Sequence, residues 1–291
     1  LIRLATSSCS QGDCAGAIRA QRSAACGSSV GGRFWDMVMR AKYIDLMRLL
    51  PTLRLPVLRL PSRCRVCHTW PSAPVCDACV TRFTQVQQRC DRCALPITGS
   101  ATTCGACLLR PPPLDTCMAA VPYSYPWSNL IASFKFQQEV GYAKQMAQIM
   151  RSTPWIEASI DQAEWIVPMP LSGIRLRERG YNQAWELAKH LAGRQARHKL
   201  RADLLLRIAH TPPQPGLPRA ERLRNVSQAF AVNPLLADQI TSRRIALVDD
   251  VMTSGASVFS AANTLKQAGA QQVSALIFAR TDAPESPHNQ A

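Results

Sequence analysis

The last third of the chain carries the pattern that most restricts its fold. Residues 245–248 form the continuous apolar run IALV, and a second apolar run, QVSALIFAR, covers residues 272–280. Between them, ASVFSAANTLKQAGA places apolar side chains on one helical face and ends near Gly269, a residue type that favours helix ends. Strand, helix and strand within about 35 residues indicate a parallel βαβ unit. The sequence therefore predicts an α/β fold whose parallel strands are buried on both faces.

Two adjacent acids, Asp249 and Asp250, follow the first apolar run directly. Ligands of open parallel sheets bind beyond the carboxyl ends of the strands. Residues 252–257 supply hydroxyls and a glycine before the helix, where free backbone N–H groups favour a phosphate. Two carboxylates repel a phosphate but accept hydrogen bonds from a vicinal diol, so a ribose 5-phosphate group suits the whole stretch. The alternative is an acidic pair that only caps the next helix.

Eight of the twelve cysteines form four C-x-x-C pairs. Two such pairs present four sulfur atoms in the tetrahedral arrangement that Zn²⁺ prefers, and metal binding would then supply much of the folding free energy. Disulfide bonds require an oxidising compartment, which no secretion signal supports, and a redox pair requires one C-x-x-C at a helix start. Sequential pairing, interleaved pairing and the loss of one site all stay open. The predicted zinc ligands are Cys64, Cys67, Cys76, Cys79, Cys90, Cys93, Cys104 and Cys107.

Several motifs occur together in a characteristic order. After the cysteine pairs come FKF, VPMPLSGIRLRERGYNQA, RLRNVSQAF and LVDDVMTSGAS. In this order, over residues 60–281, the chain resembles the competence protein F (ComF) family. The resemblance implies a type I phosphoribosyltransferase-like parallel sheet flanked by helices, with a small N-terminal cysteine-rich zinc-ribbon module. It also implies a role in the uptake of single-stranded DNA during natural transformation.

The resemblance also implies a ligand, phosphoribosyl pyrophosphate (PRPP), bound together with Mg²⁺. Asp249 and Asp250 would hold the ribose hydroxyls, and residues 253–257 would hold the 5-phosphate. Usual members of the phosphoribosyltransferase class carry threonine where this chain has Ser254 and Ser257, which keeps the hydroxyl group. The predicted PRPP-binding residues are Asp249, Asp250, Val251, Met252, Thr253, Ser254, Gly255, Ala256 and Ser257.

Positive charge is concentrated in residues 175–225, which hold twelve Lys or Arg against four acids, in a chain of net charge +15. Such an excess favours anionic partners. Arg175, Arg177 and Arg179 are predicted to neutralise pyrophosphate from one side of an extended loop, because guanidinium groups suit its oxygens. The alternative is a solvated basic loop. By the resemblance, the peptide bond between Met169 and Pro170 belongs to the pyrophosphate loop and is the candidate for an unusual, cis conformation. The alternative is the trans form, which is usual before proline.

Four further basic residues are candidates for contacts to DNA or to a lid over the site: Lys135, Arg219, Arg222 and Arg224. Lys135 lies between two phenylalanines that a helical pattern places in the core, so the alternative is a lysine that only reaches past them to solvent. The three arginines belong to a loop rich in proline.

Domain boundaries follow from changes in composition. We expect residues 1–59 to be a disordered extension or an over-extended start, residues 60–113 a zinc-ribbon module, residues 114–281 the phosphoribosyltransferase-like domain, and residues 282–291 a disordered tail. No apolar run is long enough to cross a membrane, and no secretion signal is evident. These patterns predict a cytoplasmic protein without membrane insertion.

Two functions from different classes fit the sequence. The first is a PRPP-binding factor that handles single-stranded DNA, with basic loops for the backbone and a helicase or recombination protein as a candidate partner. The alternative is an active phosphoribosyltransferase that moves phosphoribose from PRPP to a nitrogen acceptor. No acceptor pocket and no catalytic residue can be identified from the sequence.

Overall fold

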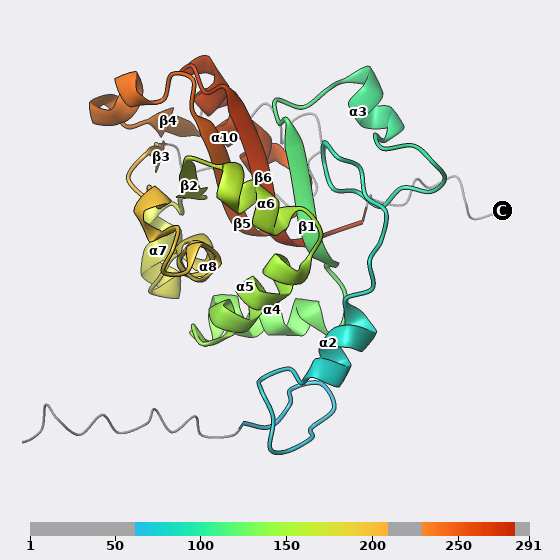
Figure 1. The fold of residues 1–291 in the computed structure, drawn as a ribbon. Coiled ribbons are helices and arrows are strands. Elements are labelled where there is room, and N and C mark those ends of the chain that lie inside the picture. The colour runs from blue at the N-terminus through green and yellow to red at the C-terminus, as the bar shows by residue number, and fades with distance from the viewer. Residues whose placement is uncertain (1–61, 209–228, 283–291) are drawn as a thin grey trace, which may run out of the picture. The chain divides into compact units, whose positions relative to one another are not determined.

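A central parallel sheet organises the protein. The computed structural model describes residues 62–208 and 229–282. The four strands of the sheet are β1 (Thr116–Pro122), β2 (Trp165–Pro168), β5 (Arg244–Met252) and β6 (Gln272–Arg280), in the spatial order β1-β6-β5-β2. Every neighbouring pair is parallel, as Figure 1 shows. The predicted parallel sheet is confirmed.

The two central strands are buried on both faces, as their apolar runs predict. On β5, Ala246 and Val248 belong to one hydrophobic core, whereas Ile245 and Leu247 belong to a second core on the other face. β6 alternates in the same way. Because strand side chains alternate between the two faces, a continuous apolar run requires cover on both sides.

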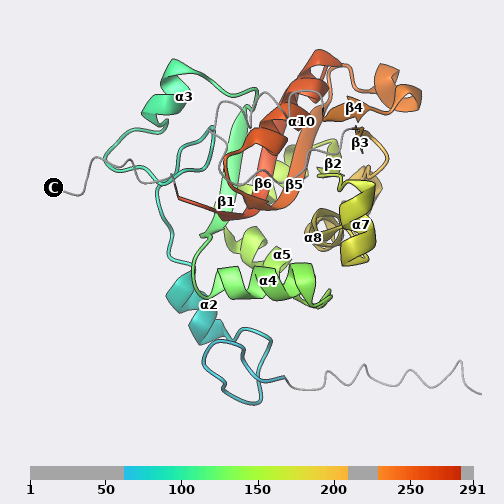
Figure 2. The ribbon, with the colours of Figure 1, turned by 180° about the vertical axis from the view of Figure 1, so that it is seen from behind.

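Helices provide that cover. The first core contains residues of α4 (Trp127–Phe136), α5 (Tyr142–Ser152), α6 (Ile156–Gln162) and α8 (Gln183–Ala192). The second core contains residues of α10 (Ala256–Gln267) and of a small antiparallel pair, β3 (Leu205–Arg207) and β4 (Phe230–Val232). Figure 2 shows α10 and β4 from behind. The remaining short helices are α2 (Asp77–Phe83), α3 (Gly105–Leu109), α7 (Gly173–Arg179), η2 (Arg197–Lys199) and η3 (Pro234–Gln239).

The cysteine-rich segment contributes residues to both hydrophobic cores. Cys64, Val75 and Cys79 join the first core, beside α4 and α5. Cys90 and Cys93 join the second core, beside the strands and α10. The two halves of this segment therefore pack against cores on opposite faces of the sheet. The boundary expected near residue 113 stays a prediction.

Some expectations lie outside the described residues. These are the extension at residues 1–59, the tail from residue 283, and the loop with Arg219, Arg222 and Arg224. Within the part of the chain that the structure describes, no helix combines the length and apolarity needed to cross a membrane.

Candidate ligand site and metal centres

A cavity of about 240 Å³ lies at the carboxyl end of β5. We call it the ligand cavity. Residues 249–257, predicted to bind PRPP, all line it. So do Met169, Pro170, Arg175 and Arg179 from the predicted pyrophosphate segment, and Lys135 from α4. Residues from three separate stretches of the sequence thus meet at one place.

The two aspartates lie within the last residues of the strand, since β5 continues to Met252. The side chain of Asp250 is almost completely buried, and its Oδ1 lies 3.1 Å from Nζ of Lys135. Its Oδ2 is buried without a hydrogen-bond partner among the described residues. Buried carboxylate oxygens normally have donors, so this oxygen has capacity for a ligand hydroxyl. Lys135 therefore belongs to the cavity and does not only reach to solvent.

The carboxyl group of Asp249 has a raised pKa. Burial and the negative charge of Asp250 raise the pKa of Asp249 to about 7, although the positive charge of Lys135 opposes the shift. Its Oδ1 accepts a hydrogen bond of 2.9 Å from the backbone N–H of Asp250. A ligand that brings hydrogen-bond donors or a cation would stabilise the charged form of this carboxyl group.

The turn between β5 and α10 depends on a glycine. Gly255 has φ +83°, and a Cβ atom there would lie 2.6 Å from side-chain atoms of both Met252 and Phe259. Other residues would be strained by the backbone angle and would also clash. α10 begins at the next residue, Ala256, whose N–H donates to Oγ of Ser254 at 3.4 Å. The next residues of the first turn, Ser257 and Val258, also line the cavity, and N–H groups in a first helical turn have no acceptor within the helix. This arrangement can hold a phosphate group.

Arg280, which sequence reasoning missed, supports this turn. It is 2% exposed at the end of β6. Its Nη1 donates to the backbone oxygens of Met252, at 3.0 Å, and of Thr253. Its Nε donates to the backbone oxygen of Cys93, at 2.8 Å. One buried guanidinium group therefore joins a predicted zinc ligand to the start of the turn. The signal in the sequence was a charged residue at the end of an apolar strand.

The arginines of the predicted extended loop are instead on a helix, so the expectation that all three share one side is wrong. Ser172 caps α7 by accepting a hydrogen bond from the N–H of Arg175, and Gly180 ends the helix with φ +76°. Residues four apart share a helical face, whereas residues two apart do not. Arg175 and Arg179 accordingly line the ligand cavity, and Arg177 does not.

The segment before α7 is held by backbone contacts. In the described residues the cis peptide bonds precede Pro71 and Pro126, so the bond before Pro170 has the usual trans form and the cis candidate is excluded. Asn182 donates to the backbone oxygen of Met169 at 3.0 Å.

Several cavity residues lie beyond those predicted: Leu171, Asn182, Gln183, Ala184, Arg207 and Val258. Of these, Arg207 lies on β3 and the side chain of Gln183 is buried. Burial and the charge of Arg175 lower the pKa of Arg207, as expected where two cations share a cavity. The positive charge at this end of the sheet therefore comes from more than one element.

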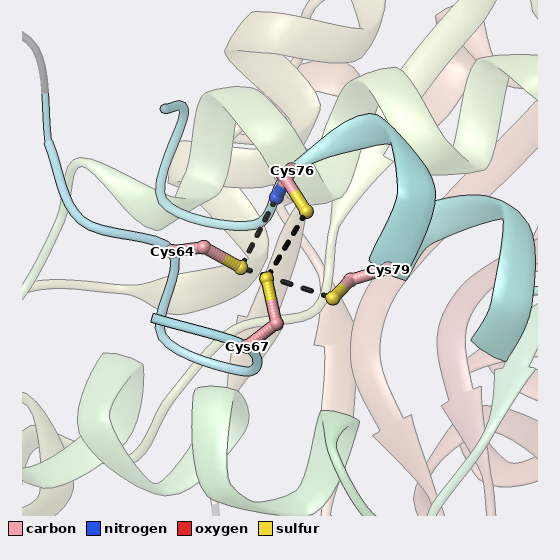
Figure 3. A group of neighbouring side chains, drawn as sticks. All are labelled: Cys64, Cys67, Cys76 and Cys79. Atoms are coloured by element: carbon pink, nitrogen blue, oxygen red, sulfur yellow. Dashed lines mark hydrogen bonds between the residues drawn. The ribbon is translucent and has the colours of Figure 1, made fainter. Parts of the chain in front are cut away.

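The eight predicted metal ligands form two clusters of four. The first cluster contains Cys64, Cys67, Cys76 and Cys79, whose side chains point toward one another in Figure 3. The second contains Cys90, Cys93, Cys104 and Cys107. The pairing is therefore sequential, and the interleaved alternative is excluded.

The sulfur positions suit a tetrahedral ion. Around a zinc with Zn–S distances of about 2.3 Å, neighbouring sulfurs lie about 3.8 Å apart. Sulfur–sulfur distances in the first cluster are 3.9 Å for Cys64 to Cys79 and 3.5 Å for Cys67 to Cys76. In the second cluster, Cys93 and Cys104 are 3.7 Å apart. Both clusters are compatible with structural zinc.

Backbone donors also point at the sulfurs. The N–H of Cys76 donates to Sγ of Cys64 at 3.4 Å, and the N–H of Cys104 donates to Sγ of Cys90 at 3.3 Å. Such bonds stabilise thiolates. Burial raises the pKa of Cys79 to about 12 and that of Cys93 to about 11. Four thiolates therefore need a bound cation to coexist at neutral pH.

Comparison with known proteins identifies the family. No family model matches the chain. Competence protein F of Haemophilus influenzae is 30% identical over 194 residues, which cover 66% of this chain and 84% of that protein. The chain belongs to the competence protein F family. The DNA utilization protein YhgH of Escherichia coli is 29% identical over 236 residues, covering 77% of this chain and all of that protein. The Salmonella typhimurium protein of the same name is 28% identical over the same length.

Membership of the competence protein F family confirms the resemblance inferred from the order of the motifs. The parallel sheet and the two four-cysteine clusters agree with the fold expected from it. The assignment of PRPP, Mg²⁺ and individual binding residues stays a prediction.

Proposed function

We propose that this chain binds PRPP in the ligand cavity and acts in the uptake of single-stranded DNA. The observation that carries the first half is the meeting of an adjacent acid pair, a glycine turn at a helix start and two arginines at one strand end. The second half rests on the relatives, which are named a competence protein and DNA utilization proteins.

Each part of the cavity matches one part of the ligand. Asp249 and Oδ2 of Asp250 accept hydrogen bonds from the ribose hydroxyls. The turn of residues 253–257 binds the 5-phosphate, and Arg175 and Arg179 bind the pyrophosphate. Mg²⁺ bound with PRPP would neutralise part of the negative charge of the pyrophosphate, as phosphate ligands commonly require.

Contacts to DNA belong to the basic residues outside the cavity. Arg177 is exposed on α7 and does not line the cavity. With a net charge of +15, the chain favours the phosphate backbone of a single strand, with an affinity that falls as salt rises. A helicase or recombination protein as partner, and a cytoplasmic location, are parts of the same proposal.

The alternative function is phosphoribosyl transfer. A nitrogen nucleophile would form a bond to carbon 1 of the ribose, and pyrophosphate would leave with the electrons of the broken carbon–oxygen bond while the nitrogen loses a proton. Positioning and charge stabilisation would supply the catalysis. The observation that favours this alternative is a second cavity beside the first, lined by an exposed aromatic ring.

Calorimetric titration tests the proposal. Zinc-loaded protein is titrated with PRPP, with and without Mg²⁺, in the wild type and in the double variant Asp249→Asn/Asp250→Asn. Asp161→Asn, an exposed acid on α6, is the matched control. We expect Mg²⁺-dependent binding in the wild type and the control, and its loss in the double variant. Absence of binding to the wild type would refute the PRPP site.

A further inference from the structure

A second cavity, of about 340 Å³, adjoins the ligand cavity. We call it the adjoining cavity. It lies between the carboxyl end of α4 and the side chains of α7. The two cavities share Lys135, Arg175 and Arg179. A ligand bound in the first cavity can therefore extend into the second.

An exposed aromatic ring lines the adjoining cavity. Phe136 is the last residue of α4 and is 72% exposed, whereas Phe134 on the same helix is completely buried. The guanidinium carbon of Arg179 lies 5.5 Å from the centroid of the Phe136 ring. The Phe136 ring is thus held by a cation and still largely accessible. Such a ring is a surface on which another planar ring can stack.

Polar groups surround the aromatic ring. Gln138 lines the cavity and has φ +55°, a backbone angle at which glycine is favoured after a helix. A glutamine there accepts backbone strain and supplies an amide, which is both a donor and an acceptor. Glu178 on α7 adds a carboxylate acceptor. Donors and acceptors beside a stacking surface suit the edge of a nitrogen heterocycle.

We propose that the adjoining cavity binds the base of a 5′-nucleotide whose ribose phosphate occupies the ligand cavity. The base stacks on Phe136, and Gln138 and Glu178 contact its polar edge. This inference rests on the proposed function, because it takes the ligand cavity as the site of the ribose phosphate. It supplies the acceptor subsite that the sequence did not reveal.

The contribution of the base is measured against a ligand that lacks it. Dissociation constants of ribose 5-phosphate, adenosine 5′-monophosphate and uridine 5′-monophosphate are determined by calorimetry for the zinc-loaded wild type and for Phe136→Ala. Phe136→Trp preserves a stacking surface. Trp155→Ala is the matched control, since Trp155 is 78% exposed and lies outside both cavities.

We expect at least one nucleotide to bind roughly 5- to 100-fold more tightly than ribose 5-phosphate, in line with stacking of one base on an aromatic side chain. In Phe136→Ala this ratio falls to about 1, because stacking on the ring is lost. The affinity for ribose 5-phosphate is unchanged in that variant. Phe136→Trp and Trp155→Ala keep the wild-type ratio.

Failure of the subsite and failure of the ligand cavity give different results. The subsite is refuted and the ligand cavity stands if ribose 5-phosphate binds and the nucleotides bind no more tightly than it does. The same conclusion follows if the higher affinity of a nucleotide persists in Phe136→Ala. If ribose 5-phosphate does not bind while a nucleotide does so through Phe136, the subsite stands without the PRPP proposal. Binding of neither ligand refutes both.

Single-stranded DNA could also supply a base that stacks on Phe136. A titration of the wild type and of Phe136→Ala with oligothymidylate distinguishes this source from a mononucleotide. If Phe136→Ala weakens binding of the oligonucleotide and leaves the nucleotide ratio unchanged, the ring contacts DNA and the subsite proposal is overturned. If the nucleotide ratio falls and oligonucleotide binding is unchanged, the cavity is a mononucleotide site as proposed.

Discussion

The two four-cysteine clusters have nearly the same sequence pattern but different surroundings. Near the first, the N–H of Val75 donates to Gln145 of α5 at 2.8 Å, and Trp127 of α4 donates to the backbone of Phe83 at 3.0 Å. Near the second, the N–H of Cys117 on β1 donates to the backbone oxygen of Asp91 at 2.7 Å. Arg280 also joins Cys93 of the second cluster to the turn after β5. The segment of the first cluster is thus bonded to helices. The segment of the second is bonded to the sheet and, through Arg280, to two residues that line the ligand cavity, Met252 and Thr253.

The bonds around the second cluster lead to an expectation about ligand binding. The Cys117–Asp91 bond and the Arg280–Cys93 bond are both made to main-chain oxygens of the second cluster's segment. Those oxygens are positioned by the fold of the second cluster and not by the first. Ligand binding should therefore depend on the second cluster far more than on the first.

Loss of a metal ligand gives the largest expected effect and tests the comparison directly. Structural zinc supplies about 10–16 kcal/mol in zinc-finger peptides. We expect Cys93→Ser to lose one zinc and to abolish PRPP binding, because the backbone at Cys93 no longer orients Arg280. Cys67→Ser, in the first cluster, should lose one zinc but retain PRPP binding. Atomic absorption measures the zinc content of each variant, and calorimetry measures its affinity for PRPP. Equal loss of PRPP affinity in the two variants would contradict the comparison.

Substitution of Arg280 tests the hydrogen bonds between Cys93 and the turn after β5 without changing a zinc ligand. Arg280→Met leaves the backbone oxygens of Cys93, Met252 and Thr253 without this donor, and the first two bonds are buried. We expect a loss of about 3–5 kcal/mol in the free energy of unfolding, measured in urea, and at least tenfold weaker PRPP binding. The zinc content should stay at the wild-type value. An unchanged PRPP affinity would show that the turn does not depend on Arg280.

Substitution of two glycines by alanine tests how much close packing contributes to the stability of the turn. Gly255 and Gly99 have almost equal backbone angles, φ +83° and +81°, but a Cβ atom at Gly99 would meet nothing within 4 Å. Gly99→Ala should cost about 1 kcal/mol from backbone strain alone. Gly255→Ala adds a clash with Met252 and Phe259 and should cost about 2–4 kcal/mol. Urea unfolding measures both, and equal costs would show that the turn relaxes freely.

The charge of Asp249 is expected to change stability less than the substitution of Gly255. Its folded pKa of about 7 lies above its ordinary value of 3.8, so the folded state holds the proton more tightly than the unfolded state. Stability is therefore greatest below about pH 4 for this group, and it falls as pH rises toward 7. Asp249→Asn should remove this decline and gain about 1–3 kcal/mol at pH 8. Thermal unfolding across this pH range measures the change in stability. If stability falls with pH in the variant as it does in the wild type, another group causes the decrease.

Much of the site was predictable because its signals are local. The strand before Asp249, the glycine turn and the helix after it lie within a few residues of one another, and their order alone indicates a phosphate-binding strand end. The arginines of α7 show where a local signal was misinterpreted. Alternate spacing indicated an extended segment, but the cap at Ser172 and the left-handed turn at Gly180 decide for a helix.

The sequence by itself determined the parallel βαβ unit, the four C-x-x-C pairs, the acid pair at the strand end and the family, since each depends on spacing along the chain. Only the tertiary structure decided how these parts meet. It paired the cysteine knuckles in order and placed the two clusters against different cores. It also brought Lys135 to Asp250, and it joined Arg280 to Cys93 across 187 residues. Contacts between distant residues leave no period or motif in a single sequence, because they depend on packing that many different spacings can produce.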